Sequence, residues 1–102
     1  MTSNRPVWDD ERAQAMIGAR VVIGLTRARQ DINRYEQMFG AITAADEIKG
    51  FEVTLEGSRT GQVYWLPPHT EAFQVASPGT YRLKATQEDV VDPDFLTTWT
   101  IE

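Results

Sequence analysis

The stretch GFEVTLEG, from Gly50 to Gly57, alternates apolar and polar side chains without interruption. Successive side chains of a strand point to opposite faces, so its apolar members share one face. These are Phe51, Val53 and Leu55. The pattern is typical of an antiparallel strand with one buried face and one face in water.

Turn signals and further β patterns lie on both sides of this strand. SRTG at Ser58–Gly61 predicts a hairpin into a strand at Val63–Leu66, which Pro67 and Pro68 end because proline cannot donate to a ladder. Other strands are expected at 20–29, from about Arg34 through a bulge near Gly40, at 73–75, at 81–85 and at 97–101. A DEIKG turn at 46–50 separates two of them.

The N-terminal part has a helix pattern instead. Asp9 is suited to cap a helix over residues 10–17, and Gly18 to end it. We therefore predict one domain over residues 1–102, with 1–8 flexible, 10–17 helical and 20–102 forming a barrel. The predicted fold is mostly β, a small antiparallel barrel with a short N-terminal helix.

Composition excludes several kinds of site. The 102 residues include no cysteine, so disulfides, thiolate zinc sites and cysteine nucleophiles are excluded. The longest apolar run, VVIGL, is far shorter than the roughly 20 residues of a membrane helix, and no membrane partner is expected. The polar, acidic N-terminus lacks the features of a secretory signal, so we expect a cytoplasmic protein.

Two resemblances bear on the fold. The segment Phe39–Leu55 resembles the first half of the Sm-type signature, in which a glycine, a hydrophobic residue and an aspartate precede an alternating strand; Gly40, Ile42 and Asp46 match it. This implies an SH3-like or Sm-like small β-barrel, but the asparagine that contacts RNA in that family is absent from 48–50. The motifs VIGLT, LPP, PGTYRL and DPDFLTTWTI also resemble a group of small bacterial proteins without an established activity.

The aromatic stretch Val63–Gly79 carries the leading functional hypothesis. Tyr64, Trp65 and Phe73, with His69, are candidate binding residues beside a corner stiffened by prolines. Adjacent strand residues point to opposite faces, so only one of Tyr64 and Trp65 can be core. We expect a non-enzymatic binding module that uses this patch or an exposed strand edge to contact a protein partner or a second copy.

Two alternatives remain open. A face with Arg27, Arg29, Arg34 and Tyr35 could bind single-stranded RNA, although the formal net charge of −5 disfavours it. Residues 1–40 hold six arginines against five acidic residues, so only this part could be basic.

The second alternative is a metal-assisted hydrolase that uses His69 with loop carboxylates such as those at 88–94. No nucleophile-elbow motif accompanies the histidine. We therefore predict no catalytic residue, metal ligand or cofactor.

Overall fold

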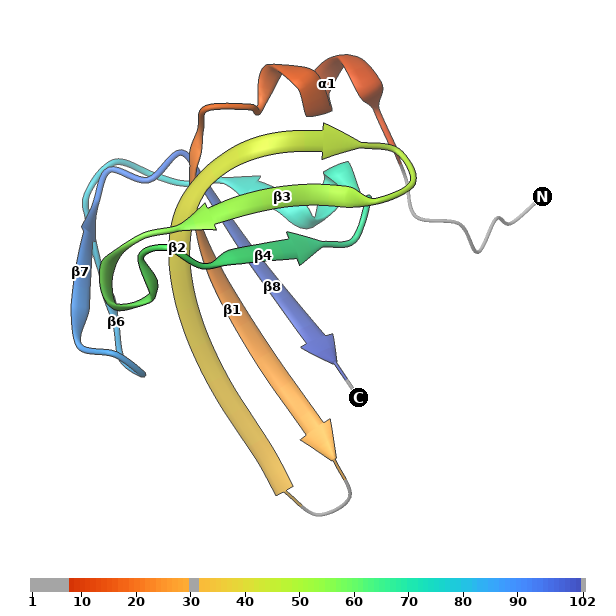
Figure 1. The fold of residues 1–102 in the computed structure, drawn as a ribbon. Helices are drawn as coiled ribbons and strands as arrows, with labels where there is room; N and C mark the ends of the chain where they lie inside the picture. Colours follow the sequence, from red (N-terminus) through yellow and green to blue (C-terminus); the bar gives the residue numbers. More distant parts are fainter. Residues whose placement is uncertain (1–7, 30–31, 102) are drawn as a thin grey trace.

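The computed structural model describes residues 8–29 and 32–101, which form a bent sheet, a separate hairpin and one short helix (Figure 1). The mostly β prediction is confirmed. The elements in chain order are α1 (Asp10–Ala15), β1 (Arg20–Arg29), β2 (Ile32–Asp46), β3 (Gly50–Leu55), η1 (Gly57–Arg59), β4 (Val63–Leu66), η2 (Thr70–Ala72), β5 (Phe73–Val75), β6 (Thr80–Leu83), β7 (Glu88–Val91) and β8 (Phe95–Ile101).

The main sheet has six strands in the order β4-β3-β2-β1-β8-β5. Its neighbours are antiparallel except β1 and β8, which run parallel. The sheet is not closed into the predicted barrel, since β4 and β5 lie at its two ends. Pro67 and Pro68 follow the end of β4, because proline cannot donate to a ladder.

Strand β1 is buried on both faces. Val21, Ile23 and Leu25 are completely buried on one face, in a core with residues of β2, β3, β4 and β5. Val22 lies on the other face, in a smaller core. The β6–β7 hairpin supplies part of that second core, with Leu83 and Val90.

Strand β2 belongs to both halves of the sheet. Figure 1 shows it curving from β1, along its first part, to β3. Its register shifts between Ile42 and Ala44, whereas pairing with β1 continues without interruption through Gly40, so the bulge predicted near Gly40 lies two to four residues further on. Gly40 instead permits a close approach, because a Cβ there would lie 2.2 Å from the Thr54 carbonyl oxygen.

Helix α1 covers one end of the larger core. The Asp9 side chain accepts a hydrogen bond from Arg12 N, as predicted for a cap, and Ala13 is completely buried. The helix ends at Ala15, two residues before the predicted end, because the Gly18 N–H donates to the carbonyl of Ile42 and turns the chain toward the sheet.

The start of the described chain is anchored beside this helix. The Trp8 ring lies 5.2 Å from that of Phe51, centroid to centroid, while residues 1–7 of the predicted flexible segment lie outside the described residues. Across 8–29 and 32–101, no helix is long and apolar enough to cross a membrane.

The predicted turn at 46–50 is confirmed. The Asp46 carboxylate accepts hydrogen bonds from Ile48 N and Lys49 N, both at 2.8 Å. Gly50 then has φ 99°, a conformation that favours glycine, and a Cβ there would lie 1.9 Å from the Leu66 carbonyl oxygen. The turn therefore sets how closely β3 approaches the end of β4.

Gly50→Ala should lower the free energy of unfolding by about 3 kcal/mol, from backbone strain of about 1 to 2 kcal/mol and a steric clash of similar size. Gly61→Ala is the matched control, because Gly61 has φ 94° but its Cβ would meet no atom within 4 Å. It should cost about 1 kcal/mol. Urea denaturation measures both, and equal losses would contradict the close approach at Gly50.

Candidate binding surfaces

Strand β4 resolves which aromatic residue faces outward. Tyr64 is half-buried and packs against the larger core, whereas Trp65 is 42% exposed. Val63 shares the outward face and is 50% exposed. The strand has no charged residue, so its outward face at the end of the sheet is apolar.

The backbone of β4 also faces outward at alternate residues. Leu55 N donates to Gln62 O at 2.9 Å, just before β4 pairs with β3 through Tyr64 and Val53. Hydrogen-bonded pairs alternate along an antiparallel ladder, so Tyr64 and Leu66 bond to β3. The N–H and C=O groups of Val63 and Trp65 therefore point to the free side of the strand.

A polar row borders this apolar edge. On the same face, Trp65 lies opposite Glu52 and Val63 lies opposite Thr54 in the β3–β4 register. Thr43 of β2 joins the row through contacts of 2.7 Å to a Glu52 carboxylate oxygen and 3.0 Å to the Thr54 hydroxyl. Trp65 and Val63 thus have this polar row on one side, and within the described residues no strand pairs with β4 on their other side.

The aromatic patch predicted from Tyr64, Trp65 and Phe73 does not exist as one surface. Phe73 is 2% exposed, and its ring lies 4.7 Å from that of Phe51 in the core. The prediction treated nearness in sequence as nearness on the surface, but β5 pairs with β8 at the opposite end of the sheet from β4.

His69 lies outside the exposed part of the edge. It is the cap residue before η2, and its ring lies 6.5 Å from the Trp99 ring in an edge-on arrangement. Thr70, immediately after it, is completely buried and accepts a hydrogen bond from Asp9 N at 3.1 Å. The His69 corner thus holds the N-terminal segment and β8 together.

An ion cluster lies beyond the larger core. Arg27 and Arg59 both donate to the Glu36 carboxylate, the latter at 3.0 Å. These hydrogen bonds, that of Arg27 first, hold the pKa of Glu36 below its ordinary value, and Glu36 raises the pKa of Arg27. The cluster was not predicted, because Glu36 and Arg59 are distant in sequence and lack any motif.

The arginines and the tyrosine predicted to bind nucleic acid lie on different faces of the sheet. Arg27 lies opposite Arg34 in the β1–β2 register, so these two share a face. Tyr35 lies opposite Thr26, on the other face of the sheet. The prediction that Tyr35 shares a nucleic-acid-binding face with these arginines is therefore wrong. The Arg29 side chain lies outside the described part of the chain.

The acidic residues at 88–94, predicted to lie in one loop, form hydrogen bonds to three different segments of the chain. Glu88 belongs to β7, while Asp92 and Asp94 precede β8, and each carboxylate accepts a backbone hydrogen bond. The donors are Ser58 N at 2.9 Å, Gly79 N at 2.7 Å and Arg20 N at 2.9 Å, respectively. Within the described ranges, no group of three or more histidine or acidic residues could hold a metal ion.

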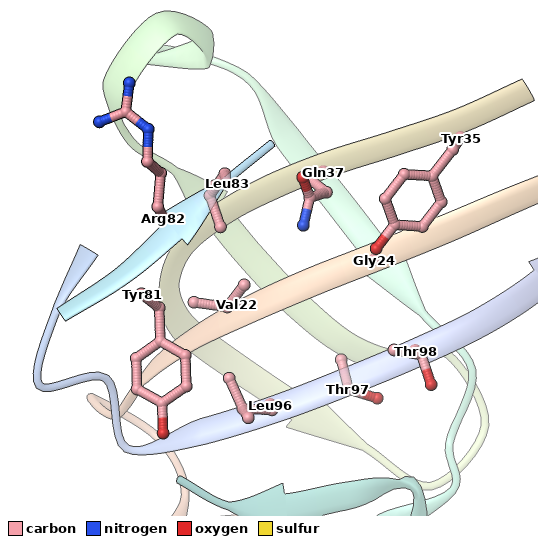
Figure 2. Close-up of a pocket in the computed structure, with 10 residues that line it drawn as sticks. All are labelled: Val22, Gly24, Tyr35, Gln37, Tyr81, Arg82, Leu83, Leu96, Thr97 and Thr98. Carbon is pink, nitrogen blue, oxygen red and sulfur yellow. The ribbon is translucent and has the colours of Figure 1, made fainter. Parts of the chain in front are cut away.

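A small pocket lies on the sheet face opposite the larger core. Its volume is about 190 Å³, and residues of β1, β2, β6 and β8 line it (Figure 2). Gly24 lies at its base, Tyr35 and Gln37 line it from β2, and Leu83 and Leu96 make it apolar on the hairpin side. Sequence reasoning missed this site because it depends on how the β6–β7 hairpin lies across the sheet.

In comparisons with protein-family models, curated proteins and solved structures, nothing matches the chain.

Glu36→Gln should destabilise the protein at pH 7 by up to about 1 kcal/mol, because two guanidinium groups lose their shared carboxylate. The pKa of Glu36 is lowered from 4.5, so its contribution is present above that pH and is lost as the pH falls through the lowered pKa. Urea denaturation at pH 7 and pH 3 should show a smaller deficit at pH 3 than at pH 7.

The control is Glu47→Gln, at an exposed position in the 46–50 turn, which should change stability little at either pH. A Glu36→Gln deficit of the same size at both pH values would contradict a role for the charge.

Proposed function

We propose that the chain is a non-enzymatic protein-binding module that takes up an extended segment of a partner protein as an added strand beside β4. The observation that carries the proposal is the end position of β4 combined with the exposed Val63 and Trp65 side chains. Sheet ends are usually protected by charge, proline within the strand or covering segments. Val63–Leu66 contains no charged residue and no proline, and within the described residues no strand pairs with the outer side of β4.

The chemistry of the edge supports a peptide as the occupant. Backbone groups of Val63 and Trp65 are spaced to bond an antiparallel strand, and main-chain bonding supplies the affinity in strand addition. Partner residues beside Val63 and Trp65 would be apolar, because aromatic and β-branched cross-strand pairs are favourable. The expected partner segment therefore carries apolar residues two positions apart.

The proposal keeps two expectations that rest on the sequence. One is an SH3-like or Sm-like relationship, supported by the N-terminal helix followed by the antiparallel strands β1 to β4. The other is a cytoplasmic setting, in which the partner is another cytoplasmic protein.

The alternatives draw less support. RNA binding on Arg27 and Arg34 loses Tyr35 to the opposite face, and Arg27 is already paired with Glu36. A hydrolase built on His69 would need carboxylates near it, whereas Glu88, Asp92 and Asp94 each bond another segment.

Peptides selected from a random linear display library test the proposal. Binders should carry apolar residues at two-residue spacing, and in protein labelled with 5-fluorotryptophan they should shift the ¹⁹F signal of Trp65 but not those of Trp8 or Trp99. Trp65→Lys should weaken binding at least tenfold. Val75→Lys is the matched control, since Val75 is 77% exposed on β5 at the other end of the sheet.

Methylation of alternate peptide backbone nitrogens should abolish binding, because strand addition depends on main-chain hydrogen bonds. Peptides that bind Trp65→Lys as tightly as the unchanged protein would overturn the proposal. So would peptides that bind equally well whichever of the two alternating sets of backbone nitrogens is methylated. A second copy as occupant would instead appear as a dimer that dissociates on dilution and is lost in Trp65→Lys.

A further inference from the structure

The pocket at Gly24 is separate from the β4 edge. It lies over β2, β1 and β8, on the face that carries the smaller core, and the hairpin strand β6 borders it (Figure 2). Strand β3 lies between β2 and β4 in the sheet. A ligand in this pocket would therefore not contact the proposed strand-addition site.

Tyr35 covers Gly24 at the base of the pocket. A Cβ at this position would lie 2.9 Å from the Tyr35 hydroxyl, so the missing side chain is what lets that hydroxyl lie over β1. Tyr35 is 53% exposed, so the ring forms an accessible wall rather than part of the core.

Gln37 has a fixed orientation at this site. Its Oε1 accepts a hydrogen bond from the backbone N–H of Ala85 at 2.8 Å, which identifies the oxygen and leaves the amide nitrogen as the donor. Figure 2 shows this nitrogen and the Tyr35 hydroxyl both directed toward β1. The pocket thus presents an N–H donor beside a hydroxyl that can accept or donate.

The charge of the pocket is low. Arg82 is the only charged residue that lines it in the described part of the chain, and Figure 2 shows its guanidinium directed away from Gly24. That group instead contacts Gln87 at 2.8 Å and Asp89 at 3.4 Å. The remaining surface combines apolar side chains, of which Leu83 is one, with uncharged polar groups.

We propose that this pocket binds a small, uncharged, planar ring compound with adjacent C=O and N–H groups, the chemistry of a uracil-type lactam. The Gln37 amide would donate to the ring carbonyl and the Tyr35 hydroxyl would accept from the ring N–H. The ring face would lie beside Tyr35, against Val22 and Leu96, which also line the pocket. The volume of about 190 Å³ is below the 300 to 1,000 Å³ typical of drug-sized ligands, which selects a single-ring compound.

Titration of the ¹⁵N-labelled protein with uracil, followed by amide chemical shifts, tests the proposal. Uracil should give saturable shifts at Gly24 and Gln37. Toluene, which lacks the polar edge, and orotate, which adds a carboxylate, should bind at least tenfold more weakly. No saturable shift with uracil, or equal binding of toluene, would overturn the proposal.

Gln37→Glu is the sharpest variant, because a carboxylate still accepts from Ala85 N but has no N–H to donate. It should weaken uracil binding at least tenfold while the Ala85 amide shift stays in place. Val75→Thr on β5 is the control and should bind uracil like the unchanged protein. Unchanged affinity in Gln37→Glu, with the Ala85 shift retained, would overturn the assigned hydrogen bond and the proposal with it.

Discussion

The parallel pairing of β1 with β8 determines the rest of the arrangement. Seven residue pairs, from Val21–Phe95 to Arg27–Ile101, join the last described strand to the first. With β2 on its other side, β1 becomes a central strand, and burial of Val21, Ile23 and Leu25 stabilises the sheet by roughly 1.5 to 3 kcal/mol each. β8 and β5 extend the sheet on one side of β1, and β2, β3 and β4 extend it on the other side. β4 therefore lies at one end of the sheet, with β5 at the other end.

The pleat of β1 and β2 then assigns each candidate residue to a surface. Arg27 and Glu36 share the face of the larger core and meet Arg59 beyond it, while Gly24, Tyr35 and Gln37 share the opposite face with the hairpin. One face thus carries an ion cluster and the other an uncharged pocket. The β4 edge adds a third surface whose chemistry is apolar and main-chain.

Local sequence patterns were sufficient for most elements. Strict alternation predicted β3, the two prolines predicted the end of β4 at Leu66, and Asp46 with Gly50 predicted a turn. Contacts between distant segments could not be predicted this way. Phe73 looks like a surface aromatic until β5 is known to pair with β8, and Gln37 gains its fixed orientation from Ala85, 48 residues away. Burial and side-chain orientation depend on which strands pair and in which register, and a local pattern does not show which distant segments pair.

Amide hydrogen exchange along β4 in dilute protein tests the open edge most directly. The account predicts that the amides of Tyr64 and Leu66 are protected by β3, and that those of Val63 and Trp65 exchange at rates close to an unstructured peptide. Protection of all four amides, unchanged on further dilution, would show that another segment covers β4 and would contradict the account.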